Sequence, residues 1–183
     1  GAYMKRNGRL TGNTIVATVM SNLGLHEFCR KNGIDLVCTN VGDRNVLEKM
    51  VECCYKLGGE QSGHMIFTDY ATTGDGELSG VQLLKTVVKS GKKLSQLAKI
   101  MTVYPQVLIN VQVTPEGKQK YNNDEYIISA VQQAEMDLMG DGRVLVRVSG
   151  TEPLVRVMLE GKDLEKITRL GNRIADVAVS YTH

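Results

Sequence analysis

A short run late in the chain combines the residue types that bind phosphate. It reads Arg147-Val148-Ser149-Gly150-Thr151-Glu152-Pro153 and is followed by Arg156. Phosphate binding needs positive charge, hydroxyl donors and exposed backbone N–H groups, and this run offers all three. We expect Gly150 to let the backbone turn and to let an anion approach closely. The alternative is an ordinary polar turn in which Arg147 pairs with Glu152, and composition alone favours that alternative.

Polar side chains lie between glycines in a second run, Gly58-Gly59-Glu60-Gln61-Ser62-Gly63-His64. Side chains that both accept and donate hydrogen bonds could read the hydroxyl groups of a sugar. The alternative is a helix stop and a turn, with His64 packed at the end of a strand.

Two further runs stand directly before predicted helices. In Val41-Gly42-Asp43-Arg44, Asp43 could cap the helix, or Asp43 and Arg44 could line a cleft. The run Thr72-Thr73-Gly74-Asp75-Gly76 could in principle cradle a phosphate. It lacks the lysine of a P-loop, so we interpret it as a turn that starts a helix.

Strands alternate with helices over the first half of the chain. Short apolar segments rich in β-branched residues predict strands at residues 14–20, 34–38 and 64–67. We predict three helices between or after these strands. The first runs from its cap Ser21 to Gly33. The other two are indicated by apolar residues on one helical face: Val46, Leu47, Met50, Val51 and Cys54 in one, and Val81, Leu84, Val87 and Val88 in the other, which ends at Gly91. The alternation predicts an α/β domain with a mainly parallel or mixed sheet.

The pattern changes near Tyr104-Pro105, where proline biases the preceding residue towards an extended backbone. Beyond it we predict a strand at 107–113, a helix from Asp124 to Gly140, strands at 144–148 and 154–159, and a helix capped by Asp163. Alternation puts Arg147 and Ser149 on one face of their strand. Consecutive strands joined by a short loop indicate an α+β domain with an antiparallel sheet.

We therefore expect two domains joined by a linker. The first covers residues 1–97, the linker residues 98–105 and the second residues 106–183. Because the linker is short and carries few apolar anchors, we expect it to act as a hinge.

Composition restricts the class of protein. Hydrophobic residues make up 42% and charged residues 23% of the 183 residues, the balance of a soluble globular protein. No uncharged apolar run is long enough to span a membrane, and residues 1–9 lack the apolar segment of a signal peptide. The net charge is +2 and basic residues are scattered, which disfavours a nucleic-acid partner.

Cysteine and histidine are too sparse and too badly spaced for a zinc site. No C-x-x-C pair occurs, and the chain has only four cysteines and three histidines: Cys29, Cys38, Cys53, Cys54, His26, His64 and His183. We interpret the cysteines as small buried hydrophobic residues in a reducing compartment.

Three of these runs occur together in one order: VGDR, GGEQSGH and RVSGTEPLVRV. In this combination the chain resembles the α-D-phosphohexomutase superfamily over nearly its whole length. RVSGTEP is specific to the superfamily, whereas GEQSGH with VGDR favours its glucosamine-phosphate branch. The runs TVMSNLG and TTGDG also resemble that branch.

The resemblance implies a four-domain enzyme with a phosphoserine in the first domain and an aspartate-rich magnesium loop opening the third. Neither motif occurs in this chain. We therefore expect it to hold most of the third domain and a fourth domain with a TATA-binding-protein-like fold. We expect Mg2+ to be bound by the full-length enzyme and not by this chain.

The resemblance also implies roles for individual residues. Glu60 and Ser62 match positions that read the sugar, and Gln61 and His64 belong to the same motif. The positions that match the phosphate-gripping loop and a nearby family arginine are Arg147, Ser149, Gly150, Thr151 and Arg156. Asp43 and Arg44 stand where relatives that act on glucose and mannose phosphates place other residues.

The implied reaction interconverts glucosamine 6-phosphate and glucosamine 1-phosphate through a phosphoserine and a bisphosphate. This chain would bind the phosphohexosamine but not turn it over. The enzyme would be cytoplasmic and serve cell-wall precursor synthesis, with a homodimer left open. The alternatives are a phosphoglucomutase or phosphomannomutase, and a non-catalytic sugar-phosphate-binding module.

Overall fold

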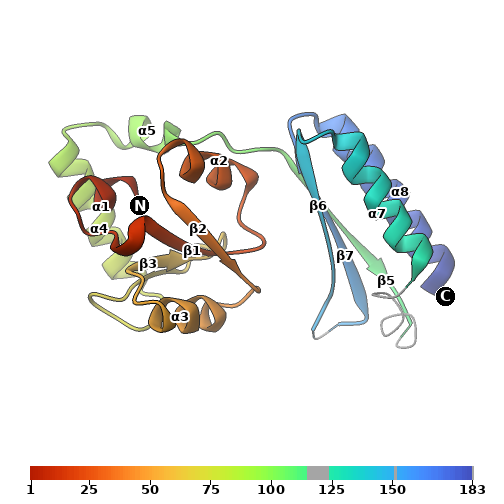
Figure 1. Ribbon diagram of the computed structural model, residues 1–183, viewed down its shortest axis with the longest axis horizontal. Coiled ribbons are helices and arrows are strands. Elements are labelled where there is room, and N and C mark those ends of the chain that lie inside the picture. Colours follow the sequence, from red (N-terminus) through yellow and green to blue (C-terminus); the bar gives the residue numbers. More distant parts are fainter. Residues whose placement is uncertain (115–123, 151, 183) are drawn as a thin grey trace. The chain divides into compact units, whose positions relative to one another are not determined.

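The computed structural model describes residues 1–114, 124–150 and 152–182, and the side chains of residues 180–182 are not described. The chain forms two compact units, Gly1–Val103 and Tyr104–His183 (Figure 1). Each unit has its own sheet and its own hydrophobic core.

A four-stranded mixed sheet forms the centre of the first unit. Its strands are β1 (Thr14–Thr18), β2 (Asp35–Thr39), β3 (Leu57–Gly59) and β4 (Met65–Phe67), in the order β2-β1-β3-β4. β2 and β3 run parallel to β1, and β4 runs antiparallel to β3. The predicted mixed sheet is confirmed, although β3 was not predicted.

Helices pack on both faces of this sheet. The described helices of the first unit are α1 (Ala2–Arg6), α2 (Leu23–Lys31), α3 (Asp43–Glu52), α4 (Gly76–Ser90) and α5 (Leu94–Leu97), with short 3-10 turns at Thr11–Asn13 and Ala98–Ile100. One face of the sheet buries Ile15 and Leu57 against α2, and the other buries Val16 against α3. Adjacent residues of β1 therefore serve opposite core layers, as alternation requires.

The capping residues of these helices are only partly as predicted. Asp75 caps α4 by accepting the Leu78 N–H at 2.8 Å, and Gly91 ends that helix in the left-handed region. Asn22, not Ser21, caps α2, accepting the Gly24 N–H at 3.0 Å. Ser21, which we predicted as the cap of this helix, lies one residue before the cap, and its backbone N–H donates to the Thr18 carbonyl at 2.9 Å in the turn after β1.

The cysteines differ from the prediction that all are buried. Cys29 is 1% exposed within the core, but Cys38 and Cys54 are exposed and Cys53 is half-buried. Because α3 ends at Glu52, the adjacent cysteines lie in the following turn and not on a helix face.

In its described residues, the second unit contains a three-stranded antiparallel sheet and the helices α7 (Glu125–Leu138) and α8 (Leu164–Thr182). The strands are β5 (Gln106–Gln112), β6 (Gly142–Val148) and β7 (Leu154–Gly161), with β7 in the centre. α7 and α8 pack side by side on one face (Figure 1). This confirms the predicted antiparallel α+β domain.

The helices of the second unit cover the valine face of its sheet. Val155 and Val157 of β7 are 0% exposed in the core, and Val146 and Val148 of β6 pack against it. Alternation therefore turns Arg147 and Arg156 towards the face opposite α7 and α8.

Candidate functional site

Polar loops follow the parallel strands of the first unit. β1 ends at Thr18, β2 is followed by the loop that contains Gly42, and β3 ends immediately before Glu60. The carboxyl ends of parallel strands meet at one edge of a sheet, which is where ligands bind in α/β proteins.

The Glu60 carboxylate is held across this edge by the neighbouring loop. Its Oε1 accepts the backbone N–H of Gly42 at 2.9 Å, and its side chain is only 10% exposed. Gly42 has φ 125°, a conformation that other residues rarely adopt. The hydrogen bond to Oε1 thereby fixes the orientation of the carboxylate, while Oε2 lies 3.7 Å from His64 Nδ1.

The remaining polar residues of this loop form one tight turn. The Glu60 N–H donates to the His64 carbonyl at 2.9 Å, and Ser62 Oγ lies 3.2 Å from His64 Nδ1. Ser62 and His64 are exposed. The turn therefore presents a carboxylate, a hydroxyl and an imidazole within a few ångströms of one another.

Thr18 is a residue of this site that the sequence did not single out. Its hydroxyl oxygen accepts the Met20 N–H at 3.3 Å, so its proton is directed to Gln61 Oε1 at 3.2 Å. Thr18 is 0% exposed. A polar residue at the end of a buried strand was the only sequence signal for this contact.

Asp43 and Arg44 lie at the start of α3, and within the described part of the chain neither side chain bonds to Glu60. The residue at the cap position is Gly42, and Asp43 instead accepts the Arg44 N–H at 2.8 Å. Arg44 pairs with Glu48 at 2.8 Å on the exposed side of the helix. The interpretation of Asp43 as the cap was therefore wrong.

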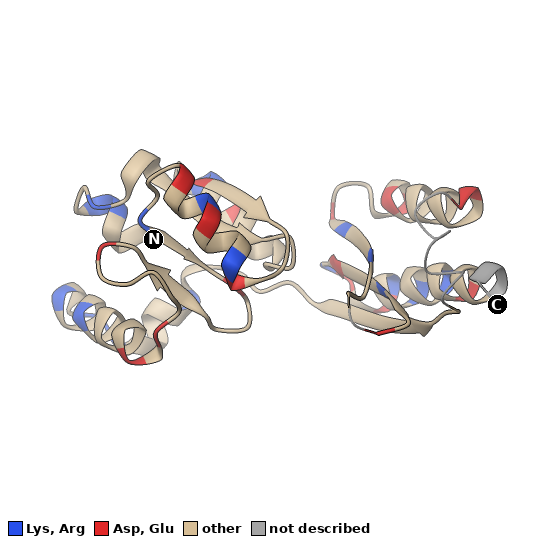
Figure 2. Cartoon of the chain, turned by 90° about the horizontal axis from the view of Figure 1, so that it is seen from below, with Lys and Arg blue, Asp and Glu red and all other residues tan. Residues whose placement is uncertain are grey.

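Acidic and basic residues alternate along α3, and each unit carries both positively and negatively charged residues (Figure 2).

Two arginines lie opposite each other on the side of the second unit's sheet that faces away from α7 and α8. Arg147 of β6 is in register with Arg156 of β7. The Nε atoms of both are buried and have no hydrogen-bond partner among the described residues. Burial, together with the nearby Arg156 charge, lowers the pKa of Arg147 from its ordinary value. A partly buried guanidinium group whose Nε–H has no partner is well suited to bind an anion.

The loop between these strands is closed by Ser149 and Glu152. Ser149 is 3% exposed, and its Oγ accepts the Glu152 N–H at 3.2 Å. The Glu152 carboxylate pairs with Arg156 at 2.7 Å. The alternative in which Arg147 takes this carboxylate is not what the structure has, because Glu152 reaches along the loop to β7.

Gly150 lies in the loop where we expected close approach of an anion. Its φ is not in the left-handed region, and a Cβ atom added there would meet nothing within 4 Å. The open space around it leaves room for such an anion. Thr151 lies outside the described residues.

The described residues do not fit a magnesium site. Within residues 1–114, 124–150 and 152–182, His, Cys, Asp and Glu side chains nowhere gather in groups of three or more. No described helix is both long enough and apolar enough to cross a membrane.

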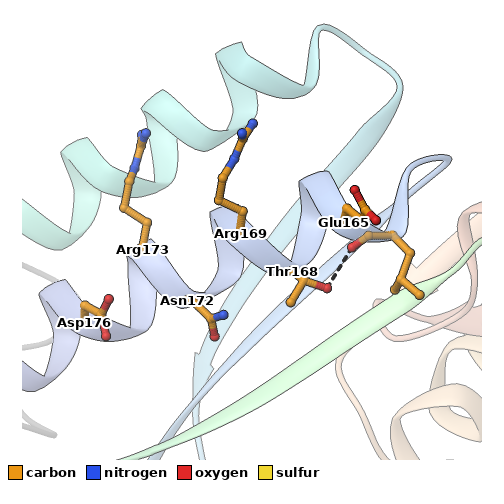
Figure 3. Close-up of a pocket in the computed structure, with 7 residues that line it drawn as sticks. Glu165, Thr168, Arg169, Asn172, Arg173 and Asp176 are labelled. Carbon is orange, nitrogen blue, oxygen red and sulfur yellow. Dashed lines mark hydrogen bonds between the residues drawn. The ribbon is translucent and has the colours of Figure 1, made fainter.

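A separate groove of about 740 Å³ runs along α8 and contains none of the predicted site residues (Figure 3). Arg173 points towards α7 and lies 3.5 Å from Asp137. The Thr168 hydroxyl donates to the Leu164 carbonyl at 2.7 Å. With Glu165 and Asp176 beside its arginines, this groove has no dominant charge.

Family models match almost the whole chain. The model of phosphoglucomutase/phosphomannomutase α/β/α domain III matches residues 1–104, and that of the C-terminal domain matches residues 108–177. The chain therefore belongs to the phosphoglucomutase/phosphomannomutase family, as the resemblance predicted.

Curated relatives narrow the comparison. The phosphoglucosamine mutase of Acetivibrio thermocellus is 57% identical over 169 residues, covering 92% of this chain and 38% of that protein. That of Ruminiclostridium cellulolyticum is 56% identical over 177 residues, covering 97% of this chain and 39% of that protein. The chain thus spans about two fifths of the length of these relatives.

Solved structures share the fold at low identity. An Aspergillus fumigatus N-acetylphosphoglucosamine mutase has a TM-score of 0.78 at 19% identity, over 99% of this chain and 40% of its own. The same enzyme in complex with GlcNAc-6P and magnesium has a TM-score of 0.73 at 18% identity, over 98% of this chain and 41% of its own. At these identities the likeness concerns the fold alone.

Proposed function

We propose that this chain supplies the sugar-binding and phosphate-binding parts of a phosphoglucosamine mutase. The longer protein interconverts glucosamine 6-phosphate and glucosamine 1-phosphate. One observation supports the proposal most strongly. A chain that is 57% identical to such an enzyme has a carboxylate held in place at Glu60 and two adjacent arginines, Arg147 and Arg156.

The loop at residues 58–64 reads the sugar in this proposal. A carboxylate with one oxygen bound to Gly42 N–H keeps a fixed orientation, and its second oxygen accepts from ring hydroxyls. Gln61, Ser62 and His64 complete the polar surface. Asp43 and Arg44 contribute through the placement of the adjacent Gly42 loop.

The loop at residues 147–156 holds the phosphate that is not reacting. Arg147 and Arg156 supply charge, and the Ser149 and Gly150 region, with Thr151, supplies uncharged donors. Binding energy from this remote phosphate positions the reacting end of the sugar. We place the phosphoserine and the magnesium loop in the part of the longer protein outside this chain, and that protein in the cytoplasm.

Assays of the longer protein and of this chain test the proposal. The longer protein should turn over glucosamine 6-phosphate with a higher kcat/KM than glucose or mannose phosphates, and the chain alone should turn over none of them. A preference for glucose or mannose phosphate would instead indicate a phosphoglucomutase or a phosphomannomutase. Turnover by this chain alone, or stoichiometric magnesium binding to it at micromolar concentration, would refute the proposal that the phosphoserine and the magnesium loop lie outside this chain.

A further inference from the structure

The phosphate loop contains a charge arrangement that needs a counter-ion when no phosphate is bound. Arg147 and Arg156 are directly opposite on adjacent antiparallel strands, where side chains lie close together. Like charges in this position repel, and both Nε atoms are already withdrawn from water without a partner among the described residues.

Glu152 supplies that counter-ion to one arginine only. Its Oε2 lies 2.7 Å from Arg156 Nη2, whereas within the described part of the chain no carboxylate pairs with Arg147. The two arginines and Glu152 together carry a net positive charge. The loop therefore remains attractive to an anion although half of its cationic pair is occupied.

Two features allow the Glu152 carboxylate to leave Arg156. Its side chain is 52% exposed, so water can solvate the carboxylate after release. The loop itself is closed by hydrogen bonds that do not involve this carboxylate: the Glu152 N–H donates to Ser149 Oγ, and the Leu154 N–H donates to the Glu152 carbonyl. Release of the side chain thus leaves the loop's backbone hydrogen bonds intact.

We infer that Glu152 is the resident counter-ion of the phosphate loop, and that a phosphate oxygen displaces its carboxylate from Arg156 to complete a two-arginine site. The inference rests on the proposed function of this loop. A dianionic phosphate can engage both guanidinium groups, whereas the single carboxylate neutralises one.

Such a counter-ion suits a reaction in which the phosphate must be released and rebound. A bisphosphate intermediate has to exchange its two ends before the second transfer. Without Glu152, release of the phosphate would leave two adjacent guanidinium groups with no carboxylate partner among the described residues. Glu152 therefore weakens phosphate binding and makes the empty loop less unfavourable.

Phosphate affinity of the loop in this chain tests the inference. Inorganic phosphate is titrated into the wild-type chain, Glu152→Gln, Arg147→Ala and the control Glu165→Gln, which removes the same charge from exposed α8. We expect Glu152→Gln to bind phosphate about two- to fivefold more tightly, the range for an exposed ion pair, and Glu165→Gln to match the wild type. In the wild type, the carboxyl carbon resonance of Glu152 should shift along the same titration as the Arg156 guanidinium signal.

The outcomes separate this inference from the proposed function. Binding that is lost in Arg147→Ala but is unchanged or weaker in Glu152→Gln would overturn the role of Glu152 as counter-ion and leave the phosphate loop standing. A Glu152 carboxyl signal that stays constant at saturating phosphate would overturn the counter-ion in the same way. If neither the wild type nor Glu152→Gln binds phosphate, both the counter-ion and the phosphate loop are wrong.

Discussion

Arg147 is the residue whose surroundings point most directly to an anion. It is partly buried, it faces Arg156, and within the described residues it lacks an acidic partner. Replacing it should remove binding to a charged group without breaking an internal ion pair. The fold should therefore tolerate the substitution better than the site does.

In the longer protein, Arg147→Ala should weaken substrate binding by about 1.5–3 kcal/mol, the range for hydrogen bonds to charged groups. Steady-state kinetics with glucosamine 6-phosphate would show this as a raised KM and a lowered kcat/KM. Arg169→Ala, on exposed α8, is the matched control and should change neither. An unchanged KM and kcat/KM in Arg147→Ala would remove the arginine from the site.

Glu60 joins the sugar loop to its neighbour through the Gly42 N–H. Glu60→Gln keeps the size of the side chain and one acceptor oxygen but removes the charge. We expect kcat/KM for glucosamine 6-phosphate to fall by tenfold or more, which corresponds to about 1.4 kcal/mol or greater. Glu48→Gln on the exposed side of α3 is the control, and equal losses in both variants would contradict a specific role for Glu60.

At the scale of the elements, α7 depends on the cap that the sequence indicated. The Asp124 carboxylate accepts the Tyr126 N–H at 3.0 Å and the Ile127 N–H at 3.1 Å. Asp124→Ala should lower the free energy of unfolding by about 1 kcal/mol, measured by urea denaturation. Glu125→Ala, one residue into the helix, should cost clearly less, and a reversed order would show that the cap is not what stabilises this helix end.

β3 was missed because its local sequence argues against a strand. Leu57–Gly59 is short, and glycine is depleted in strands. The packing of α3 explains the glycine, because a Cβ on Gly58 would clash with Met50 Sδ and lie 2.8 Å from Val46 Cγ1. The close packing of α3 thus requires glycine at position 58, and glycine weakens the sequence signal for a strand. The other strands were predictable because each contains at least three apolar residues, which give a stronger local signal than Leu57–Gly59.

The motifs located both loops, but their internal partners were not predictable. Charge alone allowed Glu152 to pair with Arg147 or with Arg156, and the register of β6 and β7 directs it to Arg156. Similarly, Thr18 reaches Gln61 only because β1 and β3 are neighbours in the sheet. Contacts between residues distant in sequence depend on topology, which a motif does not contain.

At the scale of the whole molecule, residues 98–105 contain the boundary between the two compact units, at Val103 and Tyr104. Val103 is 70% exposed, whereas Tyr104 beside it is 8% exposed and Met101 packs against a core cluster of the first unit. We predict that it acts as a hinge in the longer protein. X-ray scattering with and without glucosamine 6-phosphate should give different radii of gyration, and identical profiles at saturation would count against a hinge.

Binding of a sugar phosphate by the two loops of this chain is the central proposal. The most direct measurement is an amide-resolved NMR titration of the chain with glucosamine 6-phosphate. We predict that resonances of residues 58–64 and of residues 147–156 shift on titration, while those of the α8 groove around Arg169 and Arg173 stay unchanged. Shifts confined to that groove, or none in either loop at saturating ligand, would contradict the claim.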